Sequence, residues 1–191
     1  MDIFKAKDKS NIGTRSAKSR EADTWLKKGN DLYEHAKYED AISCFDKVIE
    51  IDPKNKWGLI NKATAPAELA RYDESIECCD KALEINPKAA WSWNTKGWAL
   101  ASLNRYDEAI SAYDKSIEIN PKSAWPWNNK AQVFVNQGKY DEAINAFDEA
   151  IRLDPRNALV WNNKGNALEA IGKTTEANAA FDKAKELGLE D

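Results

Sequence analysis

The sequence repeats itself every 34 residues, and this period constrains the fold more than any other feature. Four dipeptides that end in proline recur at that step: Asp52-Pro53, Asn86-Pro87, Asn120-Pro121 and Asp154-Pro155. Other residues recur at the same step, such as the indoles of Trp93, Trp127 and Trp161. With Ala22 as position 1, the chain divides into five repeats without an insertion. A sequence with this period stacks small structural repeats, because none of them buries its apolar face alone.

Each repeat is predicted to form two helices. In the second half of the first repeat, apolar side chains fall at i, i+3, i+4 and i+7, namely Tyr38, Ala41, Ile42 and Phe45. A short turn precedes this helix, and the proline at position 32 ends it. Position 8 holds Gly or Ala in every repeat. We expect it to face the small residue at position 20, so that the two backbones approach closely.

These residues resemble the tetratricopeptide repeat family, whose pattern is W-x2-L-G-x2-Y, then A-x3-F, then P. The third repeat carries the pattern at Trp93, Gly97, Leu100, Ala109, Tyr113 and Pro121. The resemblance implies an all-α, right-handed solenoid of ten helices that acts as a protein-protein interaction scaffold. The chain departs from the pattern in two ways. Position 7 is Lys in all five repeats, and Pro66 falls inside a first helix, which it is expected to kink.

The repeats predict the domain organisation. We expect a flexible basic leader and a C-terminal end around one five-repeat domain, with boundaries 1–21, 22–189 (22–55, 56–89, 90–123, 124–157, 158–189) and 190–191. Alternatively, Ile3 and Phe4 of the leader dock in a groove of this chain or of a second copy.

Both ends of the predicted array are polar where the inner repeats are apolar. The first repeat presents Thr24, Lys28, Asp31 and His35, and the last presents Asn178 and Lys185 where the others carry Ile or Leu. The pattern favours a complete, monomeric domain with solvated ends, because terminal repeats of an array need a polar outer face.

Composition excludes several classes of function. The chain has 28 basic and 32 acidic residues, a net charge of −4, which disfavours nucleic-acid binding. No apolar run is long enough to span a membrane, and no signal peptide precedes the repeats, so a cytoplasmic location is expected. One His and three Cys without metal spacing predict no metal and no cofactor. Carboxylates such as Asp73 recur at helix starts, where they interact favourably with the helix dipole. This accounts for them without a catalytic role, so we do not expect the protein to be an enzyme.

The candidate ligand site is one arc of the first helices. Positions 2, 5, 6, 9, 12 and 13 share this arc, which in the resembled family lines the concave groove. In repeats two to four, only Glu68 among these positions is charged, whereas four are Trp. An uncharged aromatic surface of this kind is normally covered or used. The candidate residues are Trp57, Asn61, Trp91, Asn94, Trp98, Trp125, Asn128, Asn129, Gln132, Asn162, Asn163 and Asn166.

The aromatic and amide side chains of this arc fit two kinds of contact. The Trp residues either pack across neighbouring first helices or contact a ligand. The four Trp at position 4, by contrast, are predicted to be core. An Asn carboxamide can pair with the C=O and N–H of an extended peptide whatever the side chains of that peptide. Asn61, Asn129 and Asn163 resemble the asparagine ladder of O-GlcNAc transferase and kinesin light chain repeats, although Lys27 and Thr95 interrupt it.

The predicted ligand is a protein or peptide segment that is apolar or aromatic and not acidic. The family's clamp for acidic C-terminal chaperone tails requires cations, and the matching positions Leu26, Trp91 and Thr95 supply none. Two alternatives stay open. One is a carbohydrate-binding groove, and the other is a homo-oligomer formed through the groove and the N-terminal tail.

The Lys column at position 7 has a predicted structural partner. Position 25 is Asp in every repeat and turns towards the next repeat. We therefore expect four ion pairs between repeats: Asp46–Lys62, Asp80–Lys96, Asp114–Lys130 and Asp148–Lys164.

Overall fold

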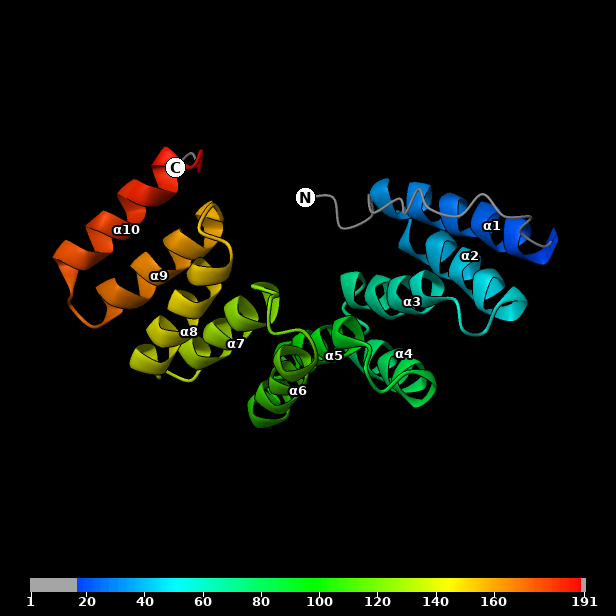
Figure 1. Cartoon of the computed structure of the whole chain (residues 1–191), viewed down its shortest axis with the longest axis horizontal. Coiled ribbons are helices and arrows are strands. Elements are labelled where there is room, and N and C mark those ends of the chain that lie inside the picture. The colour runs from blue at the N-terminus through cyan, green and yellow to red at the C-terminus, as the bar shows by residue number, and fades with distance from the viewer. Residues whose placement is uncertain (1–16, 190–191) are drawn as a thin grey trace. The chain divides into compact units, whose positions relative to one another are not determined.

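The computed structural model describes residues 17–189, which fold into ten α-helices joined by short turns (Figure 1). The predicted leader lies outside the described residues up to position 16. Its last five residues, 17–21, belong to the first helix, which begins before the first repeat. The two C-terminal residues also lie outside.

The chain divides into two compact units after Pro87. Unit 1 contains two helix pairs: α1 (Ala17–Glu34), α2 (Tyr38–Ile51), α3 (Lys56–Glu68) and α4 (Tyr72–Ile85). Unit 2 contains three: α5 (Ala90–Ser102), α6 (Tyr106–Ile119), α7 (Trp125–Asn136), α8 (Tyr140–Leu153), α9 (Ala158–Ala170) and α10 (Thr174–Glu186). In each unit, every helix packs against its neighbours in sequence, so the predicted helix-turn-helix repeat is confirmed. Helix α3 runs through Pro66 and ends two residues later.

The same turn closes every repeat between its two helices. Position 15 has a positive φ in all five repeats: Ala36, Ala70, Asn104, Gly138 and Gly172. The next residue donates its N–H back to the carbonyl five residues earlier, at 2.9–3.0 Å. This is the Schellman motif, which satisfies the last carbonyls of the first helix.

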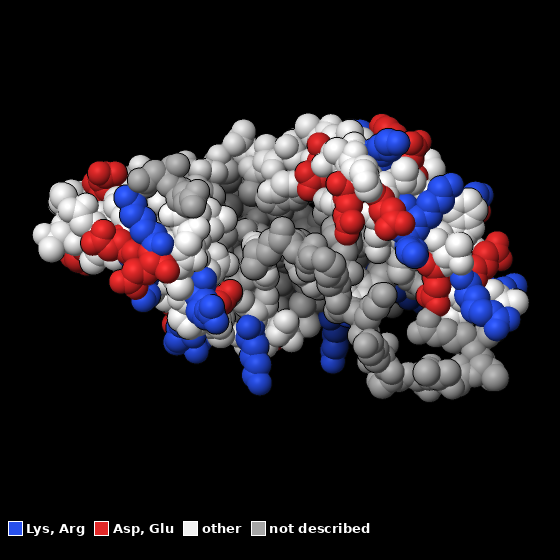
Figure 2. Space-filling model, turned by 90° about the horizontal axis from the view of Figure 1, so that it is seen from above, with Lys and Arg blue, Asp and Glu red and all other residues white. Residues whose placement is uncertain are grey.

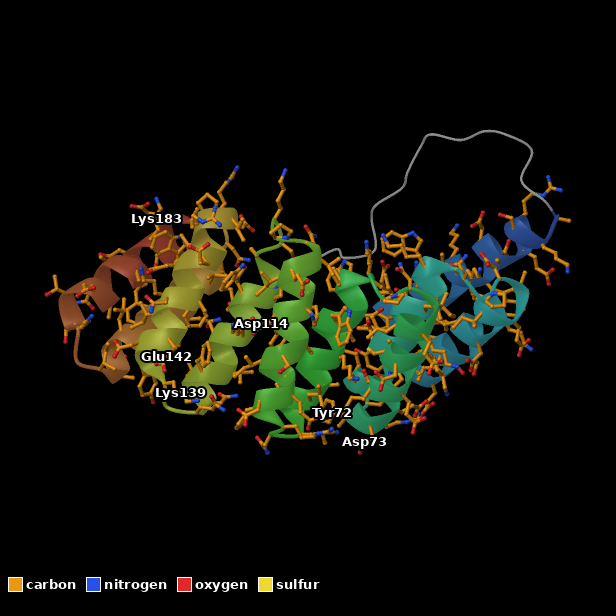
Figure 3. All side chains as sticks on the ribbon, turned by 60° about the horizontal axis from the view of Figure 1, so that its bottom comes forward. Tyr72, Asp73, Asp114, Lys139, Glu142 and Lys183 are labelled. Carbon is orange, nitrogen blue, oxygen red and sulfur yellow. The ribbon has the colours of Figure 1, made fainter. Side chains whose placement is uncertain are left out.

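Acidic residues occupy the first turn of all five second helices, where they complement the helix dipole as expected. Figure 3 labels two of them, Asp73 on α4 and Glu142 on α8.

In the three repeats with Gly at position 8, an aromatic ring at position 24 fills the space beneath it. A Cβ added at Gly97 would come within 2.7 Å of the Tyr113 ring. In the second repeat the predicted contact between positions 8 and 20 is present, because Ser75 Oγ donates to the Ala63 carbonyl at 2.6 Å. The small residue therefore accommodates a ring as well as a close backbone approach.

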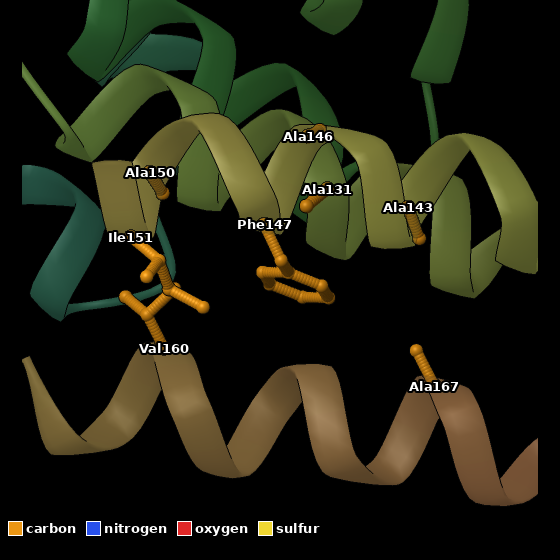
Figure 4. Packing of buried hydrophobic residues seen from close by; sticks show 8 residues of the cluster. All are labelled: Ala131, Ala143, Ala146, Phe147, Ala150, Ile151, Val160 and Ala167. Carbon is orange, nitrogen blue, oxygen red and sulfur yellow. The ribbon is translucent and has the colours of Figure 1, made fainter. Parts of the chain in front are cut away.

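The core of unit 2 continues from one repeat to the next (Figure 4). Phe147 of α8 is fully buried and points towards α9. Ile151 of α8 lies opposite Val160 of α9, and Ala143 opposite Ala167. In unit 2, the apolar faces of α6 and α8 are thus covered by the first helix of the following repeat.

The Trp residues at position 4 are not enclosed in a core, and Trp127 and Trp161 pack against the edge of the unit 2 core. Trp25, Trp93, Trp127 and Trp161 are all half-buried, so the prediction of four core indoles is wrong in degree. The Lys at position 7 of the same repeat explains the exposure. Its ammonium lies 5.1–5.8 Å from the centre of each indole ring, a cation–π contact that needs an open ring face.

Candidate functional site

The Lys column is structural, as its pairing with Asp predicted. Lys130 Nζ lies 2.6 Å from Asp114, and Lys164 Nζ lies 2.6 Å from Asp148. Lys62 pairs with Asp46 in unit 1. Three of the four expected pairs are therefore confirmed, and the pair Asp80–Lys96, whose members belong to different units, stays a prediction. These lysines already have partners and are not free to bind a ligand.

Predicted groove residues of unit 2 converge on a pocket between α5, α7 and α9. We call it the amide pocket; it encloses about 270 Å³. Eight of its lining residues belong to the predicted arc: Trp98, Ala101, Ser102, Asn128, Asn129, Gln132, Asn136 and Asn163. The spacing of 3.6 residues per turn brings these side chains to one face of each first helix, and stacking of the repeats brings the three faces together.

Four asparagines cross this surface as a chain of hydrogen bonds, which we call the amide relay. Asn163 Nδ2 donates to Asn128 Oδ1 at 3.5 Å, Asn128 Nδ2 to Asn129 Oδ1 at 3.4 Å, and Asn129 Nδ2 to Asn94 Oδ1 at 3.2 Å. The first two distances are long for hydrogen bonds. A ligand that offers better geometry can therefore replace them at little cost.

A second hollow lies at the start of α5 and α7, where Asn94 continues the relay. We call it the indole pocket; it encloses about 30 Å³. Trp91 and Trp125 line it, together with Asn120 and Ser123. Both indoles are half-buried and leave part of their surface to solvent. They occupy the same position in successive repeats, so they lie one repeat apart on this face.

Neither pocket is lined by a charged side chain. Two other hollows in unit 2 differ in this respect, because Asp182 and Lys185 line one of them and Glu142, Asp148 and Glu149 line the other. Figure 2 shows the acidic and basic side chains of the described helices, with white, uncharged surface among them. We call the two uncharged pockets together the Asn–Trp face.

The other predicted groove residues lie outside the Asn–Trp face. Asn61 of unit 1 is 2% exposed and donates to Asn30 Oδ1 at 2.7 Å, so it links two repeats. Trp57 is half-buried with the Lys56 ammonium 4.9 Å from its ring centre. In repeat five, Asn162 borders a different hollow beside Leu159, and Asn166 is exposed.

Sequence reasoning missed several residues that line the two pockets, among them Asn120 and Ser123 of the indole pocket and Tyr113 of the amide pocket. Tyr113 is buried, 1% exposed, and lines the amide pocket from α6. Burial raises the pKa of its phenol, which stays protonated at physiological pH. The sequence gives one indication of its role. Position 24 is Phe or Cys in the other repeats, so Tyr113 is the residue at this position that carries a hydroxyl.

The described residues hold no obvious reactive group. Burial raises the pKa of the Cys44 and Cys78 thiols, which keeps them in the unreactive neutral form. His35 is exposed on the first repeat and contacts the Asp31 carbonyl oxygen at 2.6 Å. No three His, Cys, Asp or Glu residues between 17 and 189 are grouped to hold a metal ion. None of the described helices has the length and apolar character to cross a membrane.

Comparison with known families identifies the repeats. Tetratricopeptide repeat profiles match residues 22–55, 90–123 and 128–188. A profile for the protein prenyltransferase alpha subunit repeat matches one stretch, 72–103. No curated protein matches the sequence.

Solved structures show the same fold. The chain is similar to PilF of Pseudomonas aeruginosa, with 20% identity and a TM-score of 0.81 over 92% of this chain and 80% of that one. It is similar to TTC0263, a tetratricopeptide repeat protein of Thermus thermophilus, with 19% identity and a TM-score of 0.77 over 89% and 93%. A third is YrrB, described as a tetratricopeptide repeat protein with an unusual peptide-binding site, with 19% identity and a TM-score of 0.64 over 91% and 93%.

Proposed function

Because this chain belongs to the tetratricopeptide repeat family, we propose that it is a protein-interaction scaffold whose Asn–Trp face binds a peptide segment. The segment is extended, apolar or aromatic, and not acidic. The fold supplies a surface for it, since each first helix that carries the face packs against the second helix of its own repeat, and α7 and α9 pack against the preceding repeat as well.

One observation carries the proposal: amide and indole side chains line two adjacent pockets without a charge among them. Indoles bury large apolar area at little conformational cost, which makes Trp a frequent anchor of binding surfaces. Carboxamides offer donors and acceptors to a peptide backbone. Such a face suits a neutral segment. The peptide-binding site described for YrrB gives a precedent in the same fold.

An acidic ligand is disfavoured by the same face. A carboxylate that enters an uncharged pocket loses water and gains no cation in return. In unit 1, the two asparagines that match the family's acid-binding clamp, Asn30 and Asn61, are bonded to each other. The proposal therefore excludes acidic tails as ligands.

Selection of peptides from a random library tests the proposal. Twelve-residue phage-displayed peptides are panned against the full chain, and the enriched peptides are measured on Trp98→Ala and Trp125→Ala. We expect sequences poor in Asp and Glu that lose at least about tenfold in affinity on both variants, because each loses a central anchor. Ile85→Ala, which removes an exposed apolar side chain of unit 1, serves as the control and should bind normally.

Several outcomes would overturn the proposal. Enriched peptides that bind the Trp variants and the native chain equally well would place the site elsewhere. A glycan that competes with every peptide and loses affinity on the same variants would favour a carbohydrate groove. Sedimentation that shows a dimer dissolved by Trp98→Ala would favour self-assembly. Thermal melts monitored by circular dichroism verify that each variant is folded.

A further inference from the structure

The amide pocket holds a hydroxyl group that the protein itself does not use. Tyr113 lines this pocket from α6 and is 1% exposed. Within the described residues its hydroxyl has no hydrogen-bond partner, and the rise in its pKa comes from burial alone. The only fully enclosed side-chain oxygen or nitrogen without a partner in residues 17–189 is Oε1 of Gln137. The small exposed part of Tyr113, which lines the pocket, therefore includes its oxygen.

Packing of the repeat does not require this hydroxyl. The same position holds Phe45, Phe147 and Phe181 in three other repeats, and the rings of Phe45 and Phe147 are fully buried without one. A buried polar group without a partner costs free energy, because it has lost water and gained no other bond. A hydroxyl that opens into a pocket at this cost is accounted for by a partner that the ligand supplies.

The depth of the hydroxyl restricts what can reach it. The other residues of the pocket lie on the first helices α5, α7 and α9, whereas Tyr113 lies on the second helix α6. Helix α6 packs against both α5 and α7, which are also in contact with each other. The backbone of a bound segment stays at the surface of the first helices, but one of its side chains can extend between them. The group that meets the hydroxyl is therefore the end of a side chain.

The hydroxyl and the pocket walls select the chemistry of that end. A hydroxyl with a free hydrogen requires an acceptor, which excludes ammonium, guanidinium and hydrocarbon ends. A carboxylate would be buried without a cation, since none lines the pocket. The amide relay leaves five N–H donors and five oxygen lone pairs unused inside it, so the walls suit a group that both donates and accepts. A carboxamide does both, and so does a Ser or Thr hydroxyl, but on a shorter arm.

We propose that the amide pocket receives a Gln or Asn side chain of the bound segment, whose oxygen accepts a hydrogen bond from the Tyr113 hydroxyl. This inference rests on the proposed function and names the residue that determines its specificity. The carboxamide of the ligand lies among Asn128, Asn129 and Gln132, which donate to its oxygen and accept from its NH2 group. The indole pocket takes an apolar or aromatic residue of the same segment, so the two pockets recognise different side chains.

Parallel selection on two forms of the full chain tests the inference. A phage library of twelve-residue peptides is panned against the native chain and against Tyr113→Phe. We expect Gln or Asn to be enriched at one position on the native chain and not on Tyr113→Phe. Tyr106→Phe is the matched control, because it removes a hydroxyl from the same helix, where that hydroxyl donates to Asn104 Oδ1 at 2.6 Å. The control should enrich the same peptides as the native chain.

A double-mutant cycle then assigns the loss of affinity to one contact. An enriched peptide is compared with a second peptide in which its Gln is replaced by Met, or its Asn by Leu, which keeps the shape without the amide. Tyr113→Phe should weaken the carboxamide peptide by at least about tenfold and the apolar peptide by less than about twofold. Thermal melts should show Tyr113→Phe to be at least as stable as the native chain, because it removes a hydroxyl without a partner. A merely structural role would lower the melting temperature and weaken both peptides equally.

The outcomes separate the inference from the function on which it rests. Peptides that require Trp98 but share no Gln or Asn, or that bind Tyr113→Phe with full affinity, would overturn the inference and leave the scaffold function standing. An enriched Ser, Thr or Tyr whose binding depends on Tyr113 would overturn the choice of a carboxamide. A native chain that selects no peptide would overturn both, whether or not it binds cellohexaose.

Discussion

At the scale of single residues, Lys130 combines an ion pair with aromatic contacts. Its ammonium bonds Asp114 of the preceding repeat, labelled in Figure 3, and lies 5.8 Å from Trp127 and 5.7 Å from Phe134. The side chain of Lys130 is only 16% exposed, whereas that of Asp114 is 53% exposed. The aliphatic stem packs while the charge stays near water, which is how a Lys is tolerated at a junction between repeats.

The pair Asp46–Lys62 yields a prediction about pH. Burial alone would lower the Lys62 pKa, but the hydrogen bond and charge of Asp46 outweigh it, so the pKa is raised. A raised lysine pKa contributes stability that is complete below the unfolded value of about 10.4 and is lost as pH rises through the folded value. Asp46→Asn should therefore destabilise the protein by about 0.2–1 kcal/mol at pH 8 and by less at pH 11.

Urea denaturation at both pH values measures this difference. Glu77→Gln removes a charge from an exposed residue of α4 in the same unit and should show no such dependence on pH. A destabilisation by Asp46→Asn that is equal at pH 8 and pH 11 would mean that the pair contributes nothing through its charges.

At the scale of the element, the turn inside each repeat carries strain in some repeats and none in others. Position 15 adopts a left-handed conformation throughout, with φ of 56° at Ala36 and 72° at Gly138. An L-residue pays about 1–2 kcal/mol for this conformation, and glycine does not. The repeats with Ala at this position therefore keep the turn because the two packed helices impose it.

This strain predicts opposite effects from opposite substitutions. Ala36→Gly should stabilise unit 1 by up to about 1 kcal/mol, because relief of strain exceeds the entropy cost of glycine. Gly138→Ala should destabilise unit 2 by about 1 kcal/mol, because alanine is strained at this positive φ. The cost should not be larger, because no atom lies within 4 Å of a new Cβ there. Chemical denaturation of the two variants checks the signs. A loss of stability in Ala36→Gly would show that the turn is not strained.

At the scale of the whole molecule, the terminal repeats are polar where the inner repeats are apolar. All four residues of the first helix that we assigned to the outer face, from Thr24 to His35, are exposed. Asn178 and Lys185 are exposed on α10, whereas their counterpart Ile151 on α8 is buried. A polar outer face removes the driving force for end-to-end stacking.

Restoring the apolar pattern at the C-terminal end should create association. The double variant Asn178→Ile/Lys185→Ile places on α10 the side chains that α8 uses to pack against the next repeat. We expect it to self-associate more strongly than the native chain in sedimentation velocity, because its new apolar face is exposed to water. Asn145→Ile/Arg152→Ile has the same spacing on the outer surface of α8 and is the control. Equal association of both double variants would mean that any added apolar surface causes association, and that the C-terminal face has no special role.

The sequence alone determined the repeat, its ten helices, the polar ends and the Asp–Lys pairs seen within the units. All of these follow from a fixed period and from a rotation of 100° per residue, which assign each position to a face of its own helix. The converging side chains of the predicted groove in unit 2 follow from the same rule.

Only the tertiary structure decided how far each side chain is buried and which amides meet. Asn61 and Asn129 share one position in the repeat, yet Asn61 is buried against Asn30 while Asn129 lines a pocket. The difference depends on which residue of the preceding repeat lies opposite the asparagine, Asn30 for Asn61 and Asn94 for Asn129. The packing of the helices sets the distance between them. The partial exposure of the Trp column and the place of Tyr113 in the amide pocket have the same origin. A sequence period fixes directions on a helix, but the depth of a side chain depends on the volumes of all its neighbours.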